Sequence, residues 1–195
     1  MLANASRRGS TDGADGVGYL RRMTNDRKRD RFDKLAPRDL VATLRSLERR
    51  LGSVKSRANN PRLSEVVERP GPSGTSLDTL LSEAARGSSL VVSAFDTALD
   101  GVEPVVPAAT IDPSERVFTD DRGWSVDAAI EVITSESDRA ADRIDSASAA
   151  GLSRAVAVTG AGATTPLAIA QQLSRELIEA LTASERHVEW LEGQV

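Results

Sequence analysis

The sequence predicts an all-α protein, a four-helix bundle with long crossover connections. Four stretches carry apolar residues at steps of three and four, which places those residues on one face of a helix. Two of the segments between these stretches, residues 59–74 and 101–123, are rich in Pro or Gly and too long for tight turns. Ala, Leu and Val supply most apolar residues while aromatics make up 3%, a composition that favours helices over sheets.

The first helix is predicted to begin at Pro37, a residue well suited to a first helical turn. It should end before Asn59-Asn60-Pro61, because the residue before a proline resists helical geometry. Its apolar face consists of Leu40, Leu44, Leu47, Leu51 and Val54. Residues 59–74 then form a connector that crosses the end of the bundle or lines a pocket.

The second helix is predicted to begin at Thr75 or Ser76, with Asp78 completing a capping box on Thr75. Its apolar face comprises Leu77, Leu80, Leu81, Ala84, Val91, Phe95 and Leu99. Gly87 lies in the middle of this helix, where it is less favourable than Ala by about 1 kcal/mol. That cost predicts either a kink or a close approach of another group at Gly87.

The third helix is predicted to begin at Ser125, after Trp124, with a polar middle over residues 134–142 that faces a pocket or solvent. The fourth begins with Thr165 as its cap and Pro166 in its first turn. Its stripe consists of Ala170, Leu173, Leu177, Leu181, Ser184, Val188 and Leu191. Such a long stripe requires partner helices to cover it.

Residues 155–165, AVAVTGAGATT, resemble a dinucleotide-binding turn, in which glycines let a phosphate approach a helix N-terminus. Thr165 stands where that motif has its third glycine, and the chain has no other βαβ unit. We therefore interpret the segment as a glycine-rich entry to the last helix.

Residues 1–34 form a flexible basic tail ahead of the bundle, which spans residues 35–195. The tail carries nine Lys or Arg against five Asp or Glu, whereas the whole chain has a net charge of −4. The basic run Arg27–Arg31 lacks interleaved aromatics, so we interpret it as solvated. A nucleic-acid contact by this arm is the weaker alternative.

The amino-acid composition and the absence of recognisable sorting signals limit the expected cellular location and the chemistry available to the protein. Without cysteine it has no thiolate nucleophile and no Cys metal site. No signal peptide and no membrane-spanning run is visible, so we expect a cytoplasmic protein with no membrane partner. The lone histidine, His187, has no second His or Cys to complete a zinc set, so we expect a structural role for it. The catalytic residues are unknown.

The order of several short motifs resembles the DinB-like proteins, the superfamily of mycothiol-dependent maleylpyruvate isomerase and related thiol S-transferases. The resemblance covers residues 35–192. Its residues are Leu35-Ala36-Pro37-Arg38-Asp39-Leu40, Arg69-Pro70-Gly71-Pro72, Ser76, Leu77, Arg86, Phe95-Asp96 and Glu176. It implies a four-helix bundle, often dimeric, that in many members holds a divalent metal with one His on the second helix and two on the last.

This sequence lacks those histidines. Glu83 and Ala84 stand near the second-helix position, and in the frame set by Glu176 the last helix has Arg175 and Glu179 where the two histidines would be. No metal or other cofactor is therefore expected. Our hypothesis is that the candidate former-site cluster Glu83, Arg175, Glu176 and Glu179 replaces the metal with the positive charge of Arg175, neutralised by Glu83 and Glu179.

These observations favour a non-catalytic binding or interaction module over an enzyme. Its partner would be a second copy of the chain through helix faces, or a small molecule or protein that the sequence does not identify. The alternative is a divergent metal-dependent thiol S-transferase or hydrolase that binds a divalent metal weakly through Glu83, Glu179 and other carboxylates. Carboxylate ligands suit Mg²⁺, Mn²⁺ or Ca²⁺ better than Zn²⁺.

Overall fold

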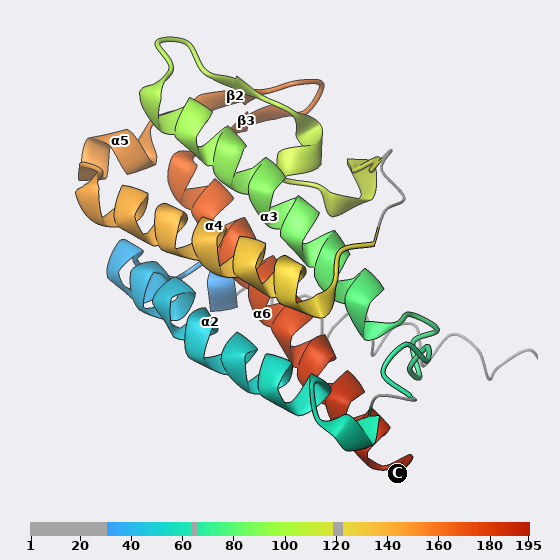
Figure 1. Ribbon diagram of the computed structural model, residues 1–195. Coiled ribbons are helices and arrows are strands. Elements are labelled where there is room, and N and C mark those ends of the chain that lie inside the picture. Colours follow the sequence, from blue (N-terminus) through green and yellow to red (C-terminus); the bar gives the residue numbers. More distant parts are fainter. Residues whose placement is uncertain (1–30, 64–65, 119–122) are drawn as a thin grey trace, which may run out of the picture.

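The computed structural model describes residues 31–63, 66–118 and 123–195. The predicted tail, residues 1–34, therefore falls outside the described residues as far as residue 30. The described chain is mostly helical, as the sequence predicts, and it contains four long helices: α2 (Pro37–Ala58), α3 (Leu77–Asp100), α4 (Val126–Ser146) and α6 (Pro166–Glu192). Helices α2 and α3 each pack against both α4 and α6, so the four enclose one core (Figure 1).

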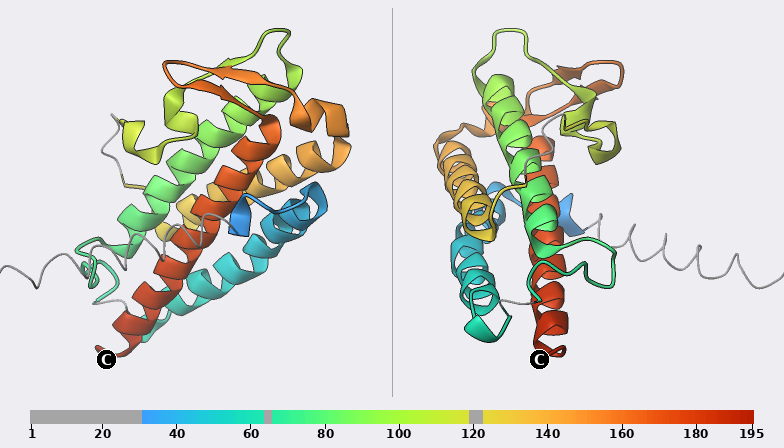
Figure 2. Two further views of the ribbon diagram at one scale, coloured as in Figure 1. Left: turned by 180° about the vertical axis from the view of Figure 1, so that it is seen from behind. Right: turned by 45° about the vertical axis from the view of Figure 1, so that its right-hand side comes forward.

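A small sheet, which the sequence analysis did not predict, lies at one end of these helices. It consists of β1 (Val105–Val106), β2 (Val156–Val158) and β3 (Gly162–Thr164), in the order β1-β2-β3. Strand β2 pairs parallel to β1 and antiparallel to β3. Figure 2 shows this sheet at the opposite end of the long helices from the C-terminus.

The segment 155–165 is therefore a β-hairpin rather than a simple entry to the last helix. Gly160 and Gly162 have φ angles of 73° and 81°, which a residue with a side chain rarely adopts, so they allow the chain to reverse between β2 and β3. The remaining described elements are short: α5 (Ala149–Ser153) and the 3₁₀ turns Pro61–Leu63, Ala108–Thr110 and Pro113–Glu115.

The predicted helix ends agree closely with the structure, with one correction at α3. Helix α2 begins at Pro37 and ends at Ala58, and α6 begins at Pro166 with the Thr165 hydroxyl accepting a hydrogen bond from the Ala168 N–H. Helix α3 begins at Leu77, and its N-cap is Ser76 rather than Thr75. The Asp78 carboxylate accepts a hydrogen bond from the Ser76 hydroxyl, so the predicted capping box does not form.

The core is built from the predicted stripes. All seven stripe residues of α6 are buried. Five of them belong to the core shared with α2, α3 and α4, whereas Leu191 packs with Leu63 and Val66 in a smaller cluster. Phe95 is the largest side chain in this core and is 1% exposed. Helix α3 continues through Gly87 as one uninterrupted helix, which leaves the close approach as the explanation for this glycine.

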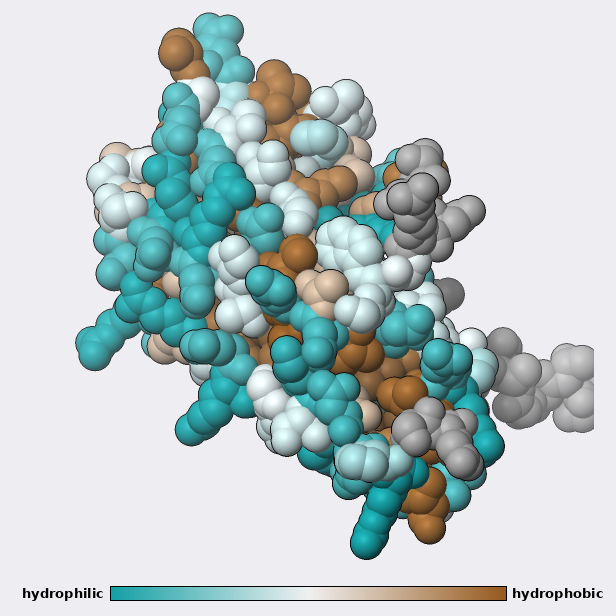
Figure 3. Space-filling model, in the orientation of Figure 1, coloured by the Kyte–Doolittle hydropathy of each residue, from teal (hydrophilic) through white to brown (hydrophobic). Residues whose placement is uncertain are grey.

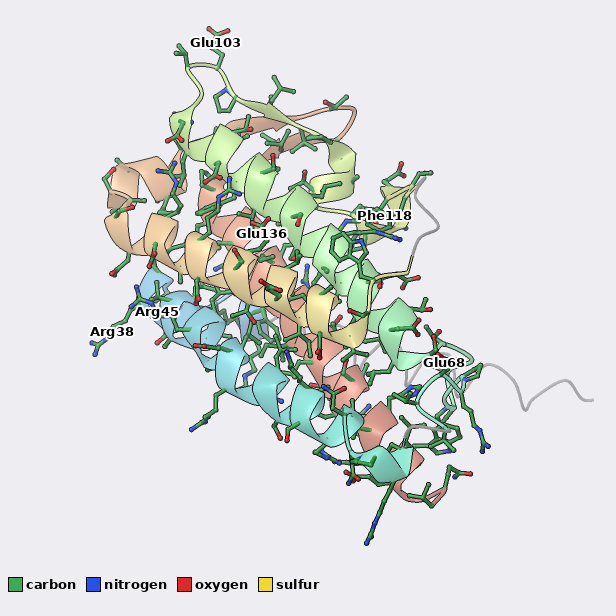
Figure 4. All side chains as sticks on the ribbon, viewed as in Figure 1. Arg38, Arg45, Glu68, Glu103, Phe118 and Glu136 are labelled. Carbon is green, nitrogen blue, oxygen red and sulfur yellow. The ribbon has the colours of Figure 1, made fainter. Side chains whose placement is uncertain are left out.

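The polar middle of α4 faces solvent and forms ion pairs with α3. Asp96 of α3 accepts hydrogen bonds from Arg139 and Arg143, and Arg139 also pairs with Glu136 on its own helix. Figure 4 shows Glu136 on α4. These arginines are one-third to one-half exposed, so each pair contributes little to stability. The prediction that this turn faces a pocket or solvent is thus resolved in favour of solvent.

Hydrophilic residues cover much of the face shown in Figure 3, and hydrophobic residues reach the surface there in small areas between them. The exposed large hydrophobic residues include Val102 at 98% and Val117 at 84%. None of the helices in the three described ranges is both long enough and apolar enough to cross a lipid bilayer.

Candidate functional site

A pocket of about 190 Å³ lies between α3 and α6. Its walls come from one face of each helix, because the lining residues are spaced i, i+3, i+4, i+7 on α3 and i, i+1, i+4 on α6. It is lined by Leu80, Glu83, Ala84 and Gly87 of α3, by Glu176, Leu177 and Ala180 of α6, and by Arg116. Most of the lining is apolar, so its three charged side chains give the pocket its chemical character.

Arg116 enters this pocket from the connection between α3 and α4. Its Nε donates to the carbonyl oxygen of Ala109 at 2.8 Å, and its Nη2 donates to that of Thr110 at 3.4 Å. Both acceptors lie in the short turn Ala108–Thr110 of this connection. The backbone of the connection therefore holds the guanidinium in place independently of its contact with α6.

Glu176 of α6 completes the arrangement as a bidentate partner. Its Oε2 accepts from Nη1 of Arg116 at 2.6 Å, and its Oε1 accepts from Nη2 at 2.8 Å. Gln172, one turn earlier on α6, donates its side-chain amide to Oε1 of Glu176. The Arg116 side chain is 8% exposed and that of Glu176 is 18% exposed, so this is the most buried ion pair of the described residues. A pair this buried requires both partners.

Gly87 makes room for this ion pair. A Cβ atom at position 87 would lie 2.9 Å from Nη1 of Arg116 and 3.7 Å from Oε2 of Glu176. The first distance is shorter than a van der Waals contact, and four hydrogen bonds hold the guanidinium in place. The glycine in the middle of α3 therefore allows the close approach of Arg116.

We expect Gly87→Ala to lower the free energy of unfolding by about 1 kcal/mol. The overpacking cost of about 1–3 kcal/mol exceeds the gain of about 1 kcal/mol from the better helix propensity of Ala. Gly52→Ala in α2 is the matched control, since no atom lies within 4 Å of a Cβ there. It should raise stability by about 0.5–1 kcal/mol. Urea denaturation of both variants measures the difference, and equal stabilisation by both would contradict the packing argument.

The structure separates the four residues predicted for the former-site cluster. Glu83 and Glu176 line the same pocket, as expected for neighbours in that cluster. Arg175 instead has its ion-pair contact with Asp33, at 3.6 Å, and Glu179 is exposed. Each residue turns by 100° around a helix, so Arg175 points toward the start of α2 while Glu176 points toward α3. The hypothesis that Glu83 and Glu179 neutralise Arg175 is therefore incorrect.

Arg116 is the residue that sequence reasoning missed. It lies 60 positions before Glu176, in a segment without helical periodicity, so no spacing rule connects the two. The signal that could have indicated it is indirect. Gly87 predicts that some group approaches α3 at this point, and the segment 101–118 contains Arg116 as its single Lys or Arg.

Arg86, the residue before Gly87, points away from this arrangement toward two aromatic rings. Its guanidinium carbon lies 5.9 Å from the ring centroids of both Phe118 and Trp124. Phe118 lies beside α3 in Figure 4. A guanidinium over aromatic rings is stabilised by cation–π attraction. This contact stabilises the packing of the segment before α4 against α3.

His187 is buried in α6, 4% exposed. It packs against the connector between α2 and α3, where a Cβ at Gly71 would lie 2.6 Å from Nδ1. Trp190 meets it edge to face at 5.8 Å between ring centroids. Nε2 is buried without a hydrogen-bond partner among the described residues. A protonated imidazole would need an acceptor there.

Burial lowers the pKa of His187 below its usual 6.5, although a hydrogen bond to the Arg69 backbone and the charge of Asp78 act to raise it. As the pH is lowered, His187 is therefore protonated at a higher pH in the unfolded chain than in the folded protein. The contribution of the neutral His187 to the free energy of unfolding should be fully present above about pH 6.5. It should fall as the pH drops through 6.5 toward the lower pKa of the folded state.

Urea denaturation at pH 7.5 and pH 5.0 tests this expectation, with His187→Gln as the comparison. The wild type should lose more stability than the variant over this interval. The Arg57 guanidinium lowers the pKa of Glu192 from 4.5, so that carboxyl titrates below the interval. An equal loss in both proteins would contradict the assignment to His187.

A second pocket, of about 620 Å³, lies where the ends of α2, α3 and α4 meet. Its polar side chains include Glu68, Asp78 and Asp127. Residues 64–65 and 119–122 adjoin it in sequence and fall outside the described residues. In the described ranges no three His, Cys, Asp or Glu residues come close enough together to hold a metal ion, here or elsewhere. We take the pocket between α3 and α6 as the candidate site because it contains the most buried ion pair of the described residues.

Comparison with protein-family models, with curated proteins and with solved structures finds no match to this chain.

Proposed function

We propose that this chain is a DinB-like four-helix bundle that acts as a non-catalytic binding module, with its ligand pocket between α3 and α6. One observation carries the proposal: the chain supplies its own cation, Arg116, between these helices and leaves a small cavity beside it. The four long helices and their two extended connections support the resemblance. Residues 35–195 form the module.

The residues of this pocket do not fit a divalent metal. Glu176 is engaged by the guanidinium of Arg116 and by Gln172. Gly87 has no side chain to offer, and Glu83 is an exposed carboxylate at the pocket mouth. A metal ion here would lie next to a fixed positive charge, which opposes its binding. The donor set therefore favours a binding module over the metal-dependent transferase or hydrolase.

Ligand-observed NMR with a library of small fragments tests the binding role. Ala180 lines the pocket and is not a partner in the Arg116–Glu176 ion pair, so Ala180→Leu should fill the cavity and abolish binding of the pocket ligands. Ala128→Leu, on an exposed face of α4, is the matched control and should keep them. The absence of any fragment whose binding depends on Ala180 would refute the proposal.

Metal titration distinguishes the alternative. Thermal denaturation with and without 1 mM Mg²⁺, Mn²⁺, Ni²⁺ or Zn²⁺ should give the same melting temperature for the binding module. A stabilisation that Glu83→Gln removes would instead support the metal-dependent enzyme, since ligand binding raises the stability of the folded state. A homodimer through helix faces remains a prediction that sedimentation velocity tests.

A further inference from the structure

The guanidinium of Arg116 has one N–H group left for a ligand. An arginine carries five N–H donors. Nε donates to Ala109, Nη2 donates to Thr110 and Glu176, and Nη1 donates to Glu176. The second N–H of Nη1 has no acceptor among the described residues. Nη1 is also the atom closest to the position that a Cβ of Gly87 would occupy, and both residues line the pocket.

An acceptor lies directly beside this donor. Oε1 of Glu176 accepts from both Arg116 and Gln172, whereas Oε2 accepts from Nη1 of Arg116 alone. A carboxylate oxygen has two lone-pair positions, so Oε2 keeps one for a ligand. Oε2 and Nη1 are 2.6 Å apart and both face Gly87. The pocket therefore presents one donor and one acceptor side by side.

The charges around this pair select against an anion. The charges of Arg116 and Glu176 cancel at the floor of the pocket, and the exposed Glu83 adds a negative charge at its mouth. A carboxylate or phosphate would be repelled by Glu83 and could not use the acceptor Oε2. An ammonium group has no acceptor of its own, so it would leave the Nη1–H unpaired next to a positive charge.

We propose that this pocket binds a small uncharged primary carboxamide, which offers an acceptor and a donor at matching positions. The carboxamide oxygen accepts from Nη1 of Arg116, and its NH₂ group donates to Oε2 of Glu176. The aliphatic part of the ligand packs against Leu80, Ala84 and Leu177. A volume of 190 Å³ equals roughly six water molecules, which suits a short branched chain. The inference rests on the proposed binding function and names its ligand class.

Three compounds of nearly identical shape test this assignment: isobutyramide, isobutylammonium and isobutyrate. Each is titrated into the ¹⁵N-labelled full chain at pH 7.5, and amide chemical shifts are followed. Isobutyramide should shift the amides of Glu83, Gly87 and Ala180 with a Kd on the order of 1–10 mM, typical for so small a ligand. Isobutyrate and isobutylammonium should bind at least tenfold more weakly. Equal or tighter binding of either one would overturn the proposal.

Three variants give the test its controls. Ala180→Leu should abolish the isobutyramide shifts, and Ala128→Leu should leave them unchanged. Glu83→Gln should strengthen isobutyrate binding at least threefold, because it removes the repelling charge and keeps the Arg116–Glu176 pair intact. Shifts by isobutyramide that persist in Ala180→Leu would place its binding elsewhere and overturn the inference.

Failure of this inference is distinguishable from failure of the proposed function. If isobutyramide does not bind but another library fragment does, and Ala180→Leu removes that binding, the ligand class is wrong and the binding module stands. If no fragment depends on Ala180, both are wrong.

Discussion

Glu176→Met is expected to lower the free energy of unfolding by about 3–5 kcal/mol. The variant leaves the guanidinium of Arg116 without its counter-charge, at a position where the side chain is 8% exposed. The carbonyl oxygens of Ala109 and Thr110 still accept hydrogen bonds there, but they do not neutralise a charge. Equilibrium urea denaturation measures the loss.

Two further variants separate the ion pair from general effects of the substitution. Glu179→Met changes an exposed carboxylate three residues further along α6, and its effect should stay within about 0.5 kcal/mol. The double variant Arg116→Met/Glu176→Met removes both charges and should be more stable than Glu176→Met alone, because no buried charge is left unpaired. A double variant whose loss of stability equals the sum of the losses measured for Arg116→Met and Glu176→Met would refute the coupling.

Phe95→Ala is expected to cost about 3–5 kcal/mol, the range for deleting a large aromatic side chain from a packed core. Phe95 is 1% exposed on α3 and belongs to the core shared by the four long helices. Three Phe residues occur in the whole chain, and Ala and Val cannot fill the volume that the ring vacates. The neighbouring helices can close the cavity only in part.

The matched control for Phe95 is Val102→Ala, since Val102 follows α3 and is 98% exposed. This substitution should change stability by less than about 0.5 kcal/mol. The melting temperatures of the two variants provide the comparison. A loss below 1 kcal/mol for Phe95→Ala would show that the ring does not fill the core as described.

Most of the helical structure could be predicted because the residues that define each long helix lie close together in the sequence. The stripe of α6 lies in consecutive turns of one segment, and Thr165 with Pro166 marks its start; both features act over a few residues. Strands β2 and β3 could not be predicted in the same way. Three residues are too few for an alternating pattern, and β1, which β2 needs as its partner, lies some fifty residues earlier in the chain.

The candidate site was predicted only in part for the same reason. Glu83 and Glu176 were identified because each lies at a definite position on a helix, and both do line the pocket. Arg116 could not be identified, because its place beside Glu176 depends on the path of the connection between α3 and α4. The sequence suggests Arg175 as the cation of the site because it is adjacent to Glu176. Each residue along a helix turns by 100°, however, so Arg175 points to another side of α6, toward Asp33.

The contact between Gly87 and Arg116 also constrains the order in which this protein can change during evolution. With Arg116 present, alanine at position 87 clashes with the guanidinium. With alanine at position 116 the obstacle disappears, and Gly87→Ala should then stabilise α3 through its helix propensity alone. The same substitution is thus harmful in one background and beneficial in the other, a case of sign epistasis. In a lineage that keeps Arg116, alanine at position 87 carries this stability cost, and prior loss of the arginine removes it.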